Sequence, residues 1–173
     1  MAITVRTNPG RLGWSLFREV SSMPNGGSED AQINPEMSPI ANVHPQRTPK
    51  GTFRLPSLTL TVGINRQNTV VLRTAKKTSE LLQHEQGHFD LLTLTCRALA
   101  RDLEAIEAQS VQDLGTHLED AKTRHEERAQ AIDAEYDRQT DHSRNRAAQL
   151  KWDAAIAHAL RDPRATKLAG MPL

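Results

Sequence analysis

Aromatic residues and cysteine are scarce in this chain of 173 residues. Phe, Trp and Tyr together make up 3% of the sequence, so a hydrophobic core must be built mainly from Leu, Ile, Val and Ala. The single cysteine, Cys96, excludes an intramolecular disulfide and any zinc cluster made of cysteines. A metal ion would therefore have to be bound by histidine and carboxylate side chains.

The sequence also lacks a strong charge of one sign and a long apolar run. Its formal net charge is +1, which gives no electrostatic reason to expect a nucleic acid or an anionic membrane as partner. No stretch reaches the roughly 18 apolar residues of a membrane span. The start, MAITVRTNPG, lacks the basic leader and apolar stretch of a signal peptide. We therefore predict a cytoplasmic protein, or a secreted or periplasmic one if an export signal has been removed.

The length predicts one domain over residues 1–173, with a change of composition near residue 76. Residues 1–75 are rich in Pro, Gly and Asn and contain short β-type runs, whereas residues 76–162 have the apolar periodicity of helices. A strand-rich part followed by a helical part is typical of the α+β class. We therefore predict a single α+β domain.

Three runs in the first part are expected to be strands: 2–5, 58–64 and 69–74. The clearest is LTLTVGI at 58–64, in which Leu60 and Val62 alternate with threonines. We expect this strand to form a sheet edge beside the first long helix, where an extended peptide could add by backbone hydrogen bonds.

The helical part begins with a long amphipathic segment. Thr78 or Ser79 can cap its start, and Glu80 lies in the first turn, where a carboxylate suits the helix dipole. Apolar residues recur at three- and four-residue steps over 82–106 and mark one apolar face. Gly115 is expected to end this helix.

A second and a third helix are expected to follow. Thr116 and Glu119 have the spacing of a capping box at the start of the second helix. The third helix is expected to begin near Ser143 and to end before Pro163. Heptads are not sustained, so we predict that the first two helices pack as an antiparallel hairpin rather than as a coiled coil.

The motif His84-Glu85-Gln86-Gly87-His88 lies inside the first predicted helix. Residues i and i+4 share one helix face about 6 Å apart, so both imidazoles can contact one ion at the usual Zn–N distance of about 2.0–2.1 Å. Glu85 is rotated by about 100° from His84, so it points beside the ion and can take a proton from a zinc-bound water. The motif therefore predicts a Zn²⁺ site with Glu85 as general base.

A catalytic zinc site needs a third protein ligand. If the hairpin turns at Gly115, the separations 115 − 88 = 27 and 142 − 115 = 27 place His142 level with the second histidine of the motif. His142 is therefore the predicted third ligand. Asp137 and Asp141 flank it and could replace it, and Asp137 could instead orient an imidazole. His44, in the irregular segment, is a further candidate.

Two stretches, HEQGHFDLL and YDRQTDH, resemble the paired motifs of a bacterial family of predicted zinc-dependent proteases, the domain of unknown function 922. The similarity continues over Asn145–Trp152. The resemblance implies that His84, His88 and His142 bind zinc and that Glu85 is the general base. Members of this family are usually predicted to be secreted, whereas this sequence begins without a recognisable signal.

The resemblance also implies a zincin-like fold: a small N-terminal β-sheet packed on a long active-site helix, then an antiparallel helical hairpin and a C-terminal helix. The expected function is that of a zinc metalloendopeptidase acting on a peptide or protein substrate. Two alternatives stay open. One is a helical interaction protein whose metal is structural or absent, and the other is a metal hydrolase acting on a non-peptide amide.

Peptide hydrolysis passes through an oxyanion that needs a hydrogen-bond donor besides the metal. Tyr136, the only tyrosine, lies close to His142 in the sequence and is the predicted donor. The alternative is that Tyr136 closes the apolar stripe of its helix. Arg138 and Arg144 are further candidates for the donor, and the alternative for both is a solvated side chain.

Overall fold

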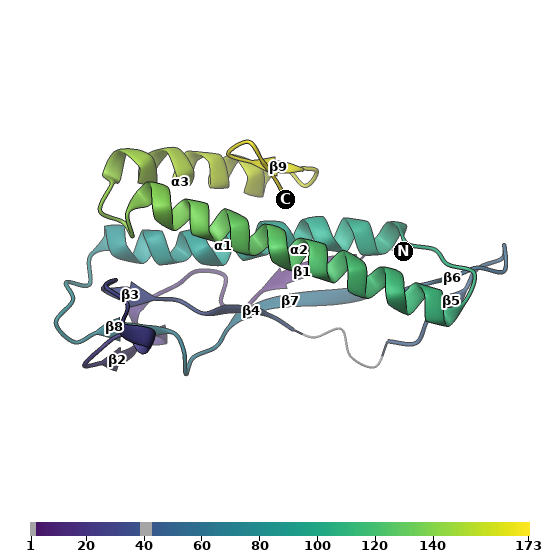
Figure 1. The fold of residues 1–173 in the computed structure, drawn as a ribbon, viewed down its shortest axis with the longest axis horizontal. Helices are drawn as coiled ribbons and strands as arrows, with labels where there is room; N and C mark the ends of the chain where they lie inside the picture. Colours follow the sequence, from purple (N-terminus) through teal and green to yellow (C-terminus); the bar gives the residue numbers. More distant parts are fainter. Residues whose placement is uncertain (1–2, 39–42) are drawn as a thin grey trace.

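A computed structural model describes residues 3–38 and 43–173 and places three long helices on a strand-rich N-terminal part (Figure 1). The helices are α1 (Ser79–Ala105), α2 (Val111–Thr140) and α3 (Arg146–Arg161). The predicted α+β class is confirmed. Among the described residues, no helix has both the length and the apolar character needed to cross a membrane.

Short strands and two 3₁₀ turns make up the first part of the chain. The strands are β1 (Ile3–Thr7), β2 (Arg18–Val20), β3 (Ala31–Gln32), β4 (Pro35–Met37), β5 (Gln46–Arg47), β6 (Phe53–Arg54), β7 (Leu58–Ile64) and β8 (Val70–Leu72), and a C-terminal hairpin adds β9 (Lys167–Leu168) and β10 (Met171–Pro172). The 3₁₀ turns are η1 (Trp14–Leu16) and η2 (Pro24–Gly26). The predicted strands at 58–64 and 69–74 correspond to β7 and β8, and β1 overlaps the prediction at 2–5, of which residue 2 lies outside the described residues.

The sheet that faces α1 has the strand order β1–β7–β4. β7 pairs in parallel with β1 and in antiparallel with β4, so it is the central strand. The prediction that 58–64 forms a sheet edge is therefore wrong. Alternation along a strand shows which face is buried, as it does for Leu60 and Val62, but does not show which strands lie on either side. The two edge strands are β1 and β4, and of these β4 was not predicted.

Hydrophobic side chains hold α1 from both sides. Towards the strands, Phe89 packs in a cluster with Val62. Towards the other helices, Leu94 packs with Ile132 and Trp152. Burial of one such side chain stabilises a fold by about 1.5–3 kcal/mol, so rotation of α1 about its axis would be costly. The sequence predicted one apolar face on α1, whereas the helix has two, one towards the strands and one towards the other helices. The residues of the motif are fixed between these two faces.

The ends of the first two helices differ from the predictions. Thr78 does cap α1, because its Oγ1 accepts from the Leu81 amide at 3.1 Å. However, α1 ends at Ala105 rather than at Gly115. The chain leaves the helix because Ala108 exchanges two backbone hydrogen bonds with Phe53 of β6, at 2.8 and 3.0 Å. The sequence gives no local sign of this long-range pairing.

The second helix starts earlier than predicted. Ser110, not Thr116, is its N-cap, and the Ser110 Oγ accepts from the Asp113 amide at 3.0 Å. Gly115 then lies inside α2. The third helix starts at Arg146 after the cap Asn145, close to the predicted start, and its end at Arg161 agrees with the prediction.

Two helical glycines have opposite surroundings. A Cβ at Gly87 of α1 would lie 2.2 Å from the Tyr136 hydroxyl of α2, whereas a Cβ at Gly115 would meet nothing within 4 Å. The absence of a side chain at Gly87 therefore allows α2 to approach α1 closely, while Gly115 only weakens its helix.

We expect Gly87→Ala to lower the free energy of unfolding by about 1–3 kcal/mol, because the new methyl group must displace Tyr136. Gly115→Ala should raise it by about 0.5–1 kcal/mol, because alanine favours an exposed helix interior. Urea unfolding followed by circular dichroism measures both. Shifts in the same direction would contradict this account of the helix contact.

Candidate metal centre

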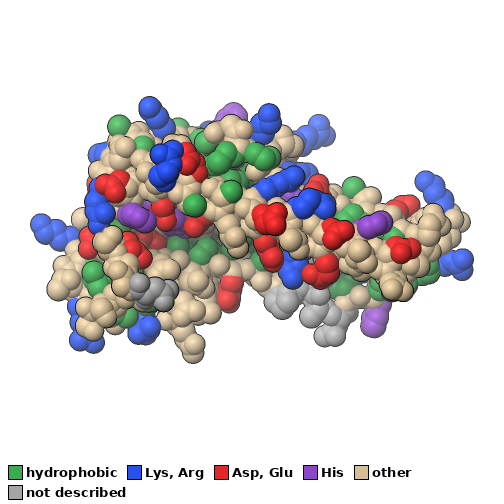
Figure 2. All heavy atoms as spheres, in the orientation of Figure 1, with side chains coloured by type: hydrophobic (Ala, Val, Ile, Leu, Met, Phe, Trp, Pro, Cys, Tyr) green, Lys and Arg blue, Asp and Glu red, His purple; other side chains and the backbone are tan. Residues whose placement is uncertain are grey.

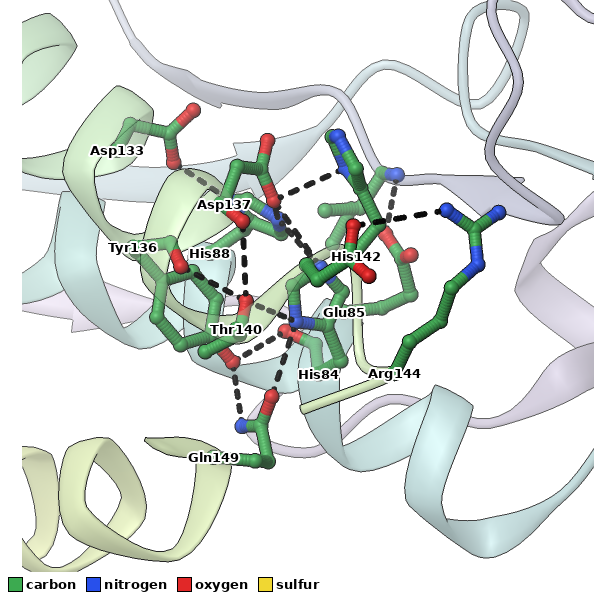
Figure 3. Close-up of polar contacts among 12 residues, drawn as sticks. His84, Glu85, His88, Asp133, Tyr136, Asp137, Thr140, His142, Arg144 and Gln149 are labelled. Carbon is green, nitrogen blue, oxygen red and sulfur yellow. Dashed lines mark hydrogen bonds and ion pairs between the residues drawn. The ribbon is translucent and has the colours of Figure 1, made fainter. Parts of the chain in front are cut away.

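The two histidines and the glutamate of the motif are buried where α1 meets α2 (Figure 3). His84 and Glu85 are each 2% exposed, and His88 is 9% exposed. The histidines lie one turn apart, with their Nε2 atoms 3.2 Å from each other. A residue of α2 completes the group: Asp137 Oδ1 is 3.1 Å from the Nε2 atom of each histidine.

Hydrogen bonds on the far side of His84 fix its ring. Gln149 of α3 donates from Nε2 to Tyr136 at 2.7 Å and to Asp153 at 2.8 Å, so its Oε1 is the acceptor. This Oε1 is 3.1 Å from Nδ1 of His84. Nδ1 therefore carries the proton, and in the neutral ring the lone pair of Nε2 points to the centre.

A carboxylate fixes the second ring in the same way. Asp133 Oδ1 lies 2.6 Å from Nδ1 of His88, so Nδ1 is the donor, and in the neutral ring Nε2 again presents its lone pair. A histidine that binds a metal commonly donates its other N–H to a carboxylate or carbonyl oxygen, which sets the tautomer. Both rings of this site have that arrangement.

Three electron-rich atoms thus converge from His84, His88 and Asp137. Asp137 Oδ1 is buried and has no hydrogen-bond partner within the described part of the chain. A tetrahedral ion with ligands at about 2.0 Å has ligand–ligand edges of about 3.3 Å, close to the observed separations. A buried polar atom without a partner is costly, so the geometry fits a divalent cation that all three atoms contact.

Charge in the site agrees with this arrangement. Burial opposes ionisation of Asp137, but its contacts with His84 and His88 outweigh burial and hold the pKa of its carboxyl well below the usual range. Burial also opposes protonation of His88, but the contacts with Asp133 and Asp137 raise its pKa well above the usual value. Asp137 is therefore ionised, and in the absence of a metal ion a proton on His88 supplies the positive charge that the group attracts.

Glu85 lies beside the converging atoms rather than among them. Its Oε2 accepts from the backbone amide of Ile33 at 2.7 Å, which ties it to the segment between β3 and β4. Burial raises the pKa of Glu85, and the neighbouring imidazoles offset part of this rise. An elevated pKa makes the carboxylate a better proton acceptor near neutral pH.

A small pocket opens onto these groups, with a volume of about 120 Å³. Its walls come from α1, from α2 and the turn after it, and from the strand-side segment: Glu29, Ala31, Gln32, Ile33, Pro35, His84, Glu85, His88, Asp133, Asp137 and His142. Figure 2 shows histidine and acidic side chains in a hollow near the end of α2 that leads to α3. This volume admits a reacting group and a few water molecules rather than a large ligand.

The predicted third ligand His142 lies beside the group but not in it. The hairpin register used to predict it was wrong, because His88 lies opposite Asp133. Three consecutive left-handed residues after α2, from Asp141 to Ser143, turn the chain back and bring His142 Nδ1 to 3.4 Å from Asp137 Oδ1. That His142 binds zinc stays a prediction, and Asp137, the alternative, is the residue in contact with both imidazoles.

The other alternative ligands are not part of the cluster formed by His84, His88 and Asp137. Asp141 has a side chain 65% exposed and lies 3.8 Å from Arg144. His44 is not among the residues that line the pocket.

Tyr136, the predicted oxyanion donor, is fully buried behind His84. Its hydroxyl donates to the His84 carbonyl at 3.1 Å and accepts from Gln149, and its ring stacks on the His84 ring with centroids 4.8 Å apart. These contacts favour a positioning role, and a donor role for this hydroxyl stays a prediction. Of the two alternative donors, Arg138 binds Glu135, while Arg144 donates to the Ser28 carbonyl at 2.9 Å beside the pocket.

Two residues of the site were not found from the sequence. Asp133 had a signal, because with Asp137 it repeats on α2 the four-residue spacing of the two histidines on α1. Gln149 had none, because an amide on a third helix carries no pattern that connects it to the motif.

Comparison with known proteins adds one match. A family model described as a bacterial protein of unknown function (DUF922) matches residues 45–143, more than half of the chain. The matched region contains α1, α2 and His142, but not α3 with Gln149. No curated protein and no solved structure matches the chain.

Zinc binding should depend on Asp137 more than on Asp141. We expect about one zinc per chain for the parent protein and a loss of more than about tenfold in affinity for Asp137→Ala, with little change for the exposed Asp141→Ala. Titration against a chromophoric chelator measures both. His142→Ala decides the ligand set, since unchanged affinity would exclude His142 and a loss equal to that of Asp137→Ala would include it.

The partners that orient the imidazoles should also affect affinity. Asp133→Asn and Gln149→Ala should each weaken zinc binding by about 10- to 100-fold, because a ring without its partner can change tautomer and rotate. Glu127→Gln, on an exposed position of α2, is the control. Equal affinity of all three variants would contradict the assigned tautomers.

Proposed function

The chain belongs to the DUF922 family of bacterial proteins of unknown function, and starting from this membership we propose that it is a zinc-dependent metalloendopeptidase. The observation that carries the proposal is the buried Asp137 carboxylate oxygen, which lies 3.1 Å from two imidazole nitrogens and beside a buried glutamate. Two imidazoles and one carboxylate are a known ligand set of catalytic zinc in peptidases, with one position open to water or substrate.

His84, His88 and Asp137 would hold the ion, with His142 as the alternative to Asp137. A bound zinc ion supplies a Lewis acid for the scissile carbonyl and lowers the pKa of water to about 7. Zinc is favoured over magnesium or calcium because two of the three converging atoms are imidazole nitrogens.

Glu85 is the proposed general base. It lines the pocket next to the converging atoms, and its raised pKa suits it to accept a proton from water and then to donate it to a leaving amine. The Ile33 amide holds one carboxylate oxygen and so restricts how this group can turn. Water cannot solvate it freely, since the side chain is almost fully buried.

Other side chains position the ligands. Asp133 and Gln149 each hold the Nδ1 of one histidine, and Tyr136 packs against the His84 ring. These contacts keep both Nε2 lone pairs directed at the same point, which lowers the cost of assembling the site.

Two other functions fit parts of the site. A structural zinc site normally has four protein ligands. The trio of His84, His88 and Asp137 beside an uncoordinated Glu85 therefore favours hydrolysis over a purely structural metal. A hydrolase acting on a non-peptide amide would use the same groups, so substrate profiling with peptides and N-acyl amino sugars separates these two.

The test of the proposal is Glu85→Gln. We expect this variant to keep its zinc and to lose about 10²- to 10⁴-fold in kcat on a peptide that the parent cleaves, because the amide cannot accept a proton. Glu80→Gln, exposed in the first turn of the same helix, should cleave at the parental rate. Zinc content is measured by atomic absorption and cleavage by mass spectrometry of a peptide library. A zinc-loaded parent that cleaves no member of the library would refute the proposal.

A further inference from the structure

We propose that a groove next to the metal centre binds an extended peptide segment in which apolar side chains are flanked by Lys or Arg. The inference rests on the proposed peptidase function and adds to it the class of substrate and the surface that selects it. It is carried by the lining of the groove, its continuity with the metal centre, the position of β4 at the edge of its sheet and the charge of the rim.

The groove is a cavity of about 580 Å³ between β4 and α2, with α1 at its base. Ligand sites commonly have volumes of about 300–1,000 Å³, so it can accept several side chains. Its apolar lining comes from all three elements: Met37, Leu92, Cys96, Leu99, Leu118 and Ala129. Apolar side chains that enter it would be removed from water, at a gain of about 25 cal/mol per Å² of buried surface.

The groove begins next to the metal centre. Leu92 and Leu99 follow His88 on α1 by 92 − 88 = 4 and 99 − 88 = 11 residues. At about 1.5 Å per residue, they lie about 6 and 16 Å along the helix from that ligand. An extended chain advances about 3.3 Å per residue, so the groove would receive side chains about two to five residues from the bond at the metal centre. Pro35 lines both cavities and joins them.

The strand on one side of the groove can pair with a peptide. In the described part of the chain β4 pairs only with β7, and it is the last strand of its sheet. The Ser38 amide donates to the Thr61 carbonyl of β7 at 2.8 Å, which sets the alternation of inward and outward groups along β4. The carbonyl of Pro35 and both backbone groups of Met37 therefore point away from β7. These groups are available to an added strand.

The rim of the groove is acidic. It carries Glu36, Glu119 and Glu126 against one cation, Lys122. The Lys122 ammonium is 3.6 Å from Glu119 and 4.0 Å from Glu126, so one positive charge is shared between two carboxylates. Figure 2 shows acidic side chains gathered along this part of α2. The excess of negative charge favours a peptide with Lys or Arg beside its apolar side chains.

A buried histidine in the same wall lacks one partner. His125 is 2% exposed, and its Nε2 lies 2.8 Å from Asp102 Oδ2. Its Nδ1 has no hydrogen-bond partner among residues 3–38 and 43–173. The ring of His125 therefore forms part of the buried wall of the groove.

Binding and cleavage test the inference separately. The binding probe is a fluorescein-labelled pool of 12-residue peptides randomised over Leu, Phe and Lys, added to zinc-loaded Glu85→Gln protein and followed by fluorescence anisotropy. Adding Ala129→Trp should fill the groove and weaken binding by about tenfold or more, while Ala131→Trp, an exposed position on the same helix, should not.

A second pair of substitutions leaves the volume of the groove unchanged. Glu119→Lys combined with Glu126→Lys should weaken binding of the Leu/Phe/Lys pool by about tenfold and leave a Leu/Phe/Gln pool unchanged. Both side chains are more than half exposed, so the fold should tolerate them.

The outcomes distinguish this inference from the proposed function. The proposal that peptides bind in the groove is overturned if the Ala129→Trp and Ala131→Trp proteins bind the pool equally, or if the pool does not bind at all. Cleavage of peptides by the parent with no effect of the groove variants also overturns it while the peptidase function stands. Binding that depends on the groove, without cleavage by the zinc-loaded parent, supports the groove and refutes the peptidase.

Discussion

The contact between the Asp137 carboxylate and the two imidazoles of α1 fixes the relation of the helices on which the site depends. One oxygen atom lies 3.1 Å from each Nε2 and 3.4 Å from the His142 ring. An ionised carboxylate at a largely buried position is stable only if positive charge is close. A cation between these atoms would supply that charge and would join α1 to α2, so metal binding and the packing of the helices would be coupled.

The remaining residues of the motif make this approach of the helices possible. Gly87 leaves the space that the Tyr136 hydroxyl fills, and that hydroxyl then bonds to the carbonyl of His84. Gln86 points to the other side of α1, where its side-chain oxygen accepts from the Leu12 amide at 2.8 Å. The motif therefore does more than supply candidate metal ligands: Gln86 attaches α1 to the N-terminal segment, and Gly87 allows the contact with α2.

Local patterns were enough to predict part of this structure. The cap at Thr78, the strand at 58–64 and the grouping of His84, Glu85 and His88 depend on residues that are close in the sequence. The turn between α1 and α2 depends on the pairing of Ala108 with Phe53, which no local pattern encodes. That error moved the hairpin register by 142 − 133 = 9 residues, because the prediction set position 142 opposite His88, where Asp133 lies.

The candidate site, too, could be predicted from local patterns only in part. Asp137 was kept as an alternative because it flanks His142, but its contact with both imidazoles depends on the true register. His142 returns to the site through the left-handed turn after α2. The residue types of this turn, Asp141 to Ser143, do not specify a left-handed conformation. Gln149 reaches His84 only because α3 folds back over both helices. Ligand types were therefore predictable, whereas the set that meets at one point required the packing of three helices.

One short segment connects the two halves of the proposed mechanism. Ile33, between β3 and β4, holds the Glu85 carboxylate through its amide, and four residues later Met37 lines the large groove. Pro35, between them, lines both the groove and the pocket at the metal centre. A peptide that paired with β4 would press on the strand that directly follows Ile33, the residue that holds the Glu85 carboxylate. Substrate binding and the position of the proposed base would then not be independent, and an extended peptide would have an advantage over a small amide that reaches only the pocket.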